Sequence, residues 1–189
     1  MGATWHPPIG DDLLLFYSER PLRQVCALIR RVRPAVILTH PPQDYMEDHM
    51  TTCRLAVTGA FARGIPNFRS GPARAPTFDP LTLYHSKPHG FADPLRGEWK
   101  PEAWVNTASV QRERLAALAC HRNQHEWLDA SQGMNSYVAS AAAEARELGR
   151  RSKKFTHAEG WTRHLHLGFG AESNDPLCDA LGRDYFSDR

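Results

Sequence analysis

The polar residues most able to do chemistry lie in one stretch, residues 39–49, which reads Thr-His-Pro-Pro-Gln-Asp-Tyr-Met-Glu-Asp-His. It holds two histidines and three carboxylates: His40, His49, Asp44, Glu47 and Asp48. Zinc takes imidazole nitrogen and carboxylate oxygen as ligands, and a carboxylate beside a ligating histidine can fix its tautomer. The stretch can therefore supply part of a metal centre. Helix caps and a buried, hydrogen-bonded histidine would use the same residues, and spacing alone leaves both interpretations open.

The segments around this stretch determine where it would lie. Residues 35–39 form a short apolar run, as expected of a strand buried on both faces. A helix is predicted over residues 47–63, and four residues share one face of it: His49, Cys53, Ala56 and Ala60. In open parallel sheets, ligands bind at the carboxyl ends of strands. The stretch therefore lies where such folds place active sites, with His49 facing inward.

The rest of the chain continues this pattern. A helix over residues 20–33 precedes the strand, and the order helix, strand, loop, helix favours an α/β fold with a parallel sheet. Further elements are expected as strands at 81–84 and 104–107 and as helices at 111–121 and 132–148. Residues 64–80 predict a long, mobile surface loop at the mouth of the site. With no repeat and no visible boundary, we expect a single domain over residues 1–189.

Composition and charge exclude other classes of protein. Hydrophobic residues are 41% and charged residues 23%, which argues against disorder. The net charge of +2 is too small to predict a nucleic-acid partner. No apolar run approaches the roughly 20 residues of a membrane helix, so no transmembrane segment is expected. The four cysteines contain no Cys-x-x-Cys pair, which favours a reduced, cytoplasmic protein.

Residues 44–49, Asp-Tyr-Met-Glu-Asp-His, resemble the second motif of the PIG-L/LmbE-like family of zinc-dependent de-N-acetylases, usually Asp-x-His-x-Asp-His. Segments in the same order agree with that family at 30–34, 65–68, 121–128 and 157–164. The resemblance implies an α/β, Rossmann-like parallel sheet with flanking helices and a zinc cofactor. It also implies hydrolysis of the acetyl group from an N-acetylated sugar, usually an N-acetylglucosamine conjugate.

The resemblance also implies roles for single residues. His49 matches the zinc ligand that this motif supplies. Asp48 matches the carboxylate just before it, which orients the site and is counted here with the catalytic residues. Asp44 matches the aspartate that braces the motif, and His121 matches a His-x-x-Gln element near the site. Substrate-binding residues stay unassigned.

The chain departs from the family pattern at two places. Met46 stands where many members have a histidine that polarises the amide carbonyl, and His164 or His166 could supply that polar group. A packing role for these two histidines is an equal alternative. The family's first strand leads into Ala-His-Pro-Asp-Asp-Glu, which supplies two zinc ligands and the general base. Residues 6–12 resemble it only superficially, because no apolar strand precedes them.

These departures set the expected form of the protein. We expect an LmbE-like domain that is N-terminally incomplete and lacks its first βα unit. A zinc de-N-acetylase is the first interpretation, with doubt that this chain alone is active. The alternative is a catalytically incomplete homologue that binds a sugar or a partner. A strand flank left unpaired would favour self-association, so a homo-oligomer is a candidate state.

Overall fold

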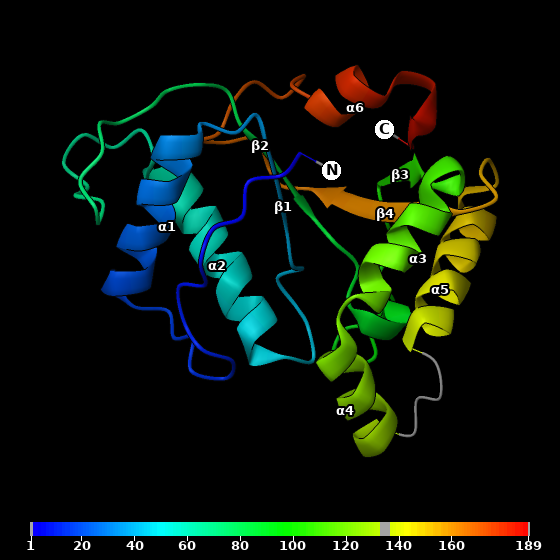
Figure 1. The fold of residues 1–189 in the computed structure, drawn as a ribbon. Helices are drawn as coiled ribbons and strands as arrows, with labels where there is room; N and C mark the ends of the chain where they lie inside the picture. Colours follow the sequence, from blue (N-terminus) through cyan, green and yellow to red (C-terminus); the bar gives the residue numbers. More distant parts are fainter. Residues whose placement is uncertain (1, 133–136, 189) are drawn as a thin grey trace. The chain divides into compact units, whose positions relative to one another are not determined.

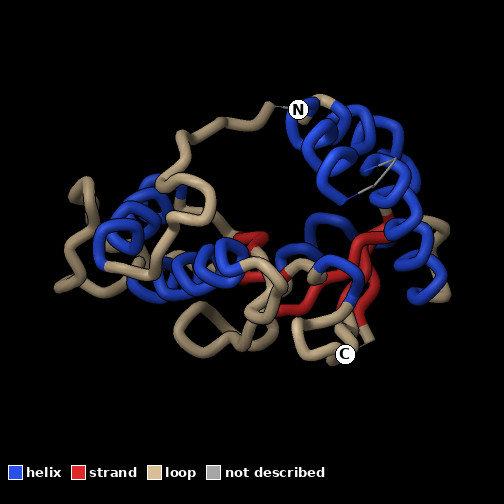
Figure 2. Tube along the Cα trace, turned by 90° about the horizontal axis from the view of Figure 1, so that it is seen from below, coloured by secondary structure: helices blue, strands red, loops and turns tan. Residues whose placement is uncertain are grey.

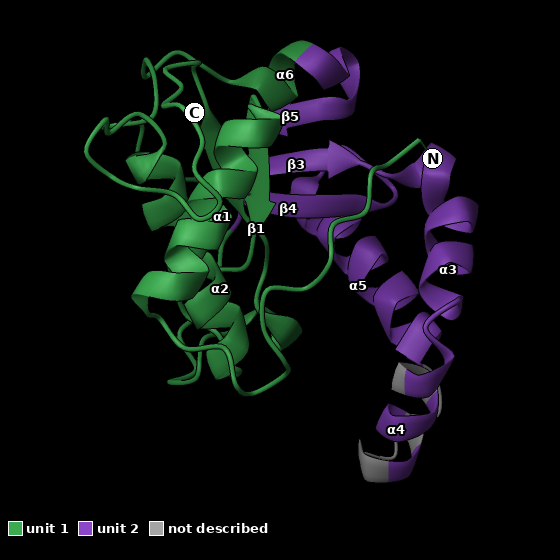
Figure 3. Cartoon of the chain, turned by 60° about the vertical axis from the view of Figure 1, so that its left-hand side comes forward, with its two compact units in different colours: residues 1–100, 162–179 green, residues 101–161, 180–189 purple. Residues whose placement is uncertain are grey.

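The computed structural model describes residues 2–132 and 137–188. The chain forms two compact units, shown in green and purple in Figure 3. Unit 1 comprises residues 1–100 and 162–179, and unit 2 comprises residues 101–161 and 180–189. Each unit is described by itself below.

Unit 1 contains the elements predicted around the polar stretch. They are α1 (Glu19–Val32), β1 (Val36–Thr39), α2 (Glu47–Ala62), β2 (Thr82–His85), the 3-10 helix η1 (His89–Phe91) and most of α6 (Pro176–Leu181). β1 runs parallel to β2, from the pair Val36–Thr82 to the pair Thr39–His85. β2 then pairs antiparallel with the last two residues of β4 (Ala158–Arg163). The helix, strand and helix predicted over residues 20–63 are confirmed.

Local sequence explains the boundaries and packing of α1 and α2. α1 ends at Val32, and the left-handed backbone of the C-cap residue Arg33 (φ 52°) closes the last turn just before Pro34. α1 and α2 lie side by side in unit 1 (Figure 1). Gly59 permits this approach, because a Cβ there would lie 2.8 Å from a methyl group of Val25. The core beneath them is apolar and contains Ile29, Ala60, Leu81, Leu83 and Phe169.

In its described residues, unit 2 contains three longer helices and three strand segments. Its helices are α3 (Gln111–Ala119), α4 (Arg122–Gln132) and α5 (Tyr137–Ser152), with the 3-10 helices η2 (Ala108–Val110) and η3 (Gly182–Asp184). β3 (Ala103–Asn106) pairs antiparallel with residues 158–161 of β4 and with β5 (Tyr185–Ser187). The helix expected at 132–148 is found as α5, although residues 133–136 lie outside the described part. α4 was not predicted.

The five strands are hydrogen-bonded in the order β1-β2-β4-β3-β5. Figure 2 shows them in red and the helices in blue. The predicted α/β class, with a sheet flanked by helices, is confirmed, while parallel pairing is confined to β1 and β2. β1 stands at one end of this order, and the side chain of Leu38 within it is 53% exposed. Among the described helices, none is both long and apolar enough to cross a bilayer.

The loop over residues 64–80 does not lie where the sequence predicted. The buried guanidinium of Arg30 donates hydrogen bonds to five carbonyls: Ala62, Arg63, Ile65, Phe68 and Arg74. These bonds hold the loop at the C-terminal end of α2. The 16 residues of α2 span roughly 24 Å, and His49 lies in the first turn at the other end. The prediction that this loop borders His49 is therefore wrong.

Candidate functional site

Polar side chains of unit 1 gather at the carboxyl ends of β1 and β2. His40 directly follows β1, and His85 is the last residue of β2. His49 lies in the first turn of α2, and His164 directly follows β4. Contacts described below join His40 to His49 and His85 to His164 through their rings, and the backbone carbonyl of His40 joins the two pairs. These four residues are called the histidine cluster from here on. The short parallel strands thus bring together residues that lie far apart in the sequence.

Asp44 and His49 form the half of the cluster that the sequence predicted. Asp44 is only 1% exposed, and its Oδ1 accepts the backbone N–H of Met46 at 3.0 Å. The same oxygen lies 3.0 Å from Nδ1 of His49. The imidazole is not aligned for a hydrogen bond, however, so Nδ1 of His49 is buried without a hydrogen-bond partner. Asp44 therefore braces the N-terminus of α2 and sets a negative charge beside a buried ring nitrogen.

The ring of His40 covers His49. The two imidazoles stack with centroids 4.0 Å apart and an angle of 9° between their planes. Burial lowers the pKa of His40, the neighbouring His49 lowers it further, and Asp44 opposes both effects. Tyr45 meets His49 edge-on at 6.1 Å. Stacking and edge contact together limit the orientations open to His49.

His85 and His164 form the other half of the cluster. Nδ1 of His85 lies 2.9 Å from the carbonyl oxygen of His40, and its Nε2 lies 2.9 Å from Nδ1 of His164. His85 is 4% exposed, and burial lowers its pKa despite the bond to the His40 carbonyl. Burial also lowers the pKa of His164, followed in size by the effect of His85. Both shifts favour the neutral form of the two rings.

Cys53 completes the surroundings of His85 without forming a nucleophile. Its Sγ lies 3.6 Å from Nδ1 of His85. Burial raises the pKa of the Cys53 thiol to about 11. Because the thiolate is the reactive form, a buried thiol with this pKa is inert near neutral pH. The pair is consequently a packing contact rather than a Cys–His catalytic pair.

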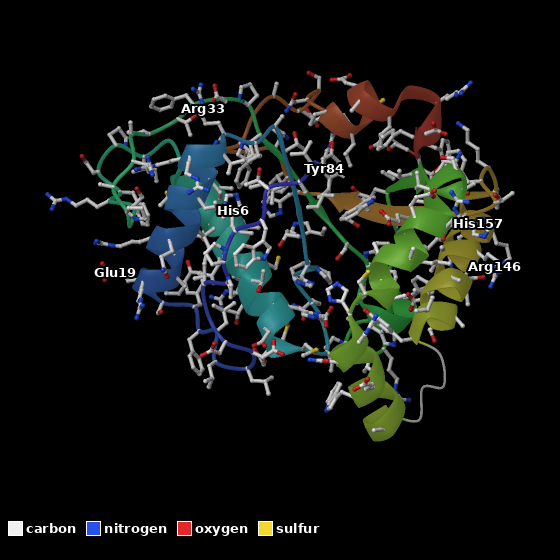
Figure 4. The ribbon with its side chains drawn as sticks, in the orientation of Figure 1. His6, Glu19, Arg33, Tyr84, Arg146 and His157 are labelled. Atoms are coloured by element: carbon white, nitrogen blue, oxygen red, sulfur yellow. The ribbon has the colours of Figure 1, made fainter. Side chains whose placement is uncertain are left out.

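Other predicted residues have different surroundings. Oδ2 of Asp48 accepts the backbone N–H of Leu13 at 2.6 Å, so this carboxylate anchors the N-terminal segment onto α2. His121 belongs to unit 2, where it is exposed between α3 and α4. His6, labelled in Figure 4, has its Nδ1 2.8 Å from the guanidinium of Arg31 on α1. This contact attaches His6 to α1.

His85 is the residue of the cluster that sequence reasoning missed. A usable signal was present, because residues 81–84 were predicted as a strand and His85 follows them directly. If that strand is parallel to the first, its carboxyl end meets the same sheet edge as His40. The signal was therefore positional, a histidine at the end of a second strand.

The cluster fits one ligand of a zinc site. Oδ1 of the buried Asp44 lies 3.0 Å from Nδ1 of His49, which makes no hydrogen bond among the described residues. A carboxylate beside one ring nitrogen is expected of a histidine that binds a metal through the other nitrogen. A catalytic zinc needs about three protein ligands. Within residues 2–132 and 137–188, no three His, Cys, Asp or Glu side chains converge in a way that could hold a metal ion. The described residues do not make a complete zinc site.

Neither a protein-family model nor a curated protein sequence matches the chain. Solved structures do match in fold. The 4-carboxy-2-hydroxymuconate hydratase GalB from Pseudomonas putida has a TM-score of 0.64 at 22% identity, over 83% of this chain and 62% of that chain. The conserved protein TT1542 from Thermus thermophilus has a TM-score of 0.60 at 20% identity, over 82% of this chain and 62% of that one.

A third match is the N,N'-diacetylchitobiose deacetylase from Pyrococcus horikoshii, complexed with its inhibitor MPG. It has a TM-score of 0.61 at 18% identity, over 88% of this chain and 59% of that chain. This chain therefore spans about three-fifths of the length of these neighbours. At such identities the likeness establishes the fold, which is similar to the LmbE-like fold of the neighbours.

Proposed function

We propose that this chain forms part of a zinc-dependent hydrolase that removes the acetyl group from an N-acetylated sugar. The Asp44–His49 pair at the carboxyl end of β1 is the observation that carries the proposal. Two further observations support it: the motif over residues 44–49, and a fold similar to that of a deacetylase acting on a diacetylated disaccharide. N-acetylglucosamine conjugates are the substrate class that the family resemblance suggests.

Each residue of the pair has a part in this proposal. His49 would bind the zinc ion, which when bound supplies a Lewis acid for the acetamide carbonyl and a water of lowered pKa. Asp44, fixed by the Met46 N–H, keeps negative charge beside the His49 ring and favours its orientation. Asp48 accepts a hydrogen bond from the backbone N–H of Leu13 and would help to orient the first turn of α2, which carries His49.

The remaining zinc ligands would come from a further segment beside β1. In the family pattern, that segment is a strand followed by His-Pro-Asp-Asp-Glu. β1 stands at one end of the strand order, so its outer edge can accept a neighbouring parallel strand. A strand added there would place its carboxyl end beside His40 and His49.

A binding module without catalysis is the second candidate. The observation in its favour is that no three potential ligands converge among the described residues. Fold likeness does not decide between the two, since one neighbour is a hydratase and another a deacetylase.

A paired assay tests the proposal. Acetate release from N-acetylglucosamine conjugates and zinc content are measured for these 189 residues and for a version extended by a strand and His-Pro-Asp-Asp-Glu. We expect negligible release from the shorter protein, and zinc together with turnover in the extended one. The extended His49→Ala protein is the control and should lose both. A folded, zinc-loaded extended protein that releases no acetate would overturn the enzyme assignment and favour the binding module.

A further inference from the structure

The histidine cluster contains a directional chain of hydrogen bonds that the proposed function does not use. It runs from the carbonyl of His40, through the ring of His85, to the ring of His164. We propose that His85 is a positioning residue that holds His164 as its Nδ1-protonated tautomer, which leaves Nε2 of His164 as a proton acceptor. Tautomer control follows from the hydrogen bonds alone, whereas the acceptor's part in catalysis rests on the proposed function.

The first step is the tautomer of His85. Its Nδ1 lies 2.9 Å from the carbonyl oxygen of His40. A carbonyl oxygen only accepts hydrogen bonds, so this contact is favourable when Nδ1 of His85 carries the proton. In a neutral imidazole, the other nitrogen is then a bare acceptor. Nε2 of His85 therefore has a lone pair to offer.

The second step passes this choice to His164. Nε2 of His85 lies 2.9 Å from Nδ1 of His164. Since Nε2 of His85 accepts, Nδ1 of His164 must donate. In the neutral ring of His164 the remaining nitrogen, Nε2, is then unprotonated. One backbone carbonyl thus decides the protonation pattern of two consecutive rings.

Cys53 is the one neighbour that could reverse the direction. Its thiol could donate to Nδ1 of His85 across 3.6 Å. That arrangement would require an unprotonated Nδ1 facing the carbonyl oxygen of His40 at 2.9 Å, with two lone pairs opposed. A thiol is a weak donor at the longer of the two distances. The His40 carbonyl therefore determines the direction.

His164 is held firmly enough for its tautomer to matter. Its backbone N–H donates to the carbonyl of Leu83 at 2.9 Å. Its ring meets Phe169 edge-on, with centroids 5.4 Å apart. Together with the Nδ1 bond to His85, these contacts leave Nε2 as the ring nitrogen available to a ligand.

An unprotonated, positioned Nε2 suits amide hydrolysis. It can take one proton from water while the water oxygen bonds to the acetyl carbon, and the carbonyl π electrons move to oxygen. It can return that proton to the amide nitrogen as the oxyanion re-forms the carbonyl and the C–N bond breaks. The products are acetic acid, which ionises to acetate by giving its proton to the amine or to solvent, and the amine. No oxidant, reductant or further reactant is required. The family histidine missing at Met46 would thus have a counterpart from another element of unit 1.

Nitrogen NMR of the 189-residue chain, with ¹⁵N in its histidine rings, tests the tautomers directly. Above the pKa of both rings, we expect protonated Nδ1 and bare Nε2 at His85 and His164. In His85→Phe, His164 should change to a mixture rich in the Nε2-protonated form, which free histidine prefers. In His85→Gln, a side-chain oxygen can still accept from His164, so the Nδ1-protonated form should persist. The opposite tautomer at His164 in the unaltered protein would overturn the proposal, whether or not the variants fold.

The matched control is His166→Phe, which alters a histidine two residues further along the same segment. We expect it to leave the tautomer of His164 unchanged, and a change as large as that in His85→Phe would contradict a specific role for His85. Acetate release by the extended protein separates the two proposals. If an extended protein shows the expected tautomers but no turnover, the hydrolase proposal is wrong and the positioning role of His85 stands. If the extended protein releases acetate while Nε2 of His164 is protonated, the positioning role of His85 is wrong and the hydrolase proposal stands.

Discussion

Thr39 and His85 are the last register partners of the parallel strands β1 and β2. Because His40 is the next residue after Thr39, this register sets its carbonyl 2.9 Å from Nδ1 of His85. The same end of β1 leads into the loop that carries Asp44, and this loop leads into the first turn of α2, which carries His49. A single strand pairing therefore joins the predicted half of the site to the half that was not predicted.

The metal assignment predicts the effect of removing one imidazole. His49→Ala should abolish stoichiometric zinc in the extended protein, because His49 is the one described residue whose surroundings suit a ligand. The measurement is metal content per chain after dialysis. His157→Ala, which removes a partly exposed histidine of unit 2, is the control and should retain zinc. Zinc bound by His49→Ala with unchanged affinity would show that the assignment is wrong.

Asp44 should contribute to stability as well as to the site. Asp44→Ala leaves the Met46 N–H without its acceptor, which typically costs about 1–3 kcal/mol in the free energy of unfolding. Asp44→Asn keeps a side-chain oxygen and should lose less. Urea unfolding of both variants checks this, with Glu47→Ala as an exposed neighbour on the same helix end. Equal loss in the Asn and Ala variants would contradict the role of the acceptor oxygen.

Arg30 should not be replaceable by lysine. Its guanidinium is buried and donates hydrogen bonds to five carbonyls of α2 and the following loop. The ammonium group of lysine has three donors and cannot make all five bonds. We expect Arg30→Lys to lower the free energy of unfolding by about 3 kcal/mol. Arg31→Lys, at an exposed neighbouring position, should change it by about 0.5 kcal/mol or less. Similar denaturation midpoints for the two variants would refute this.

Sequence periodicity was sufficient for the elements around Asp44 and His49. The apolar spacing of residues 20–33 and 47–63 and the run at 35–39 predicted α1, α2 and β1 closely, because burial of one helix face or of a whole strand leaves a regular pattern. α4 was missed, since its residues 122–132 have few apolar positions.

Long-range contacts were beyond the sequence. His164 meets His85 only because β4 pairs with β2 as well as with β3, its neighbour in the chain, and no local pattern encodes that order. The contacts of the buried Arg30 are also long-range, and for this reason the position of the loop over residues 64–80 was predicted wrongly. As one of many arginines, Arg30 gave no sign that it would hold residues 65–74 at the far end of α2.

The histidine cluster predicts how stability depends on pH. Burial lowers the pKa of His85 and His164 in the folded chain, whereas an unfolded histidine titrates near 6.5. Below that pH the unfolded chain binds more protons, so the free energy of unfolding should fall as the pH drops from about 6.5 toward the lowered values. The ring of His85 contacts the Cys53 thiol and the backbone carbonyl of His40. His40 adds to the same trend because its pKa is lowered too. Urea unfolding between pH 7.5 and 5 measures the slope, which should be shallower in His85→Gln and unchanged in His157→Gln. A stability that rises as the pH falls through this range would show that the two rings are not held neutral by burial.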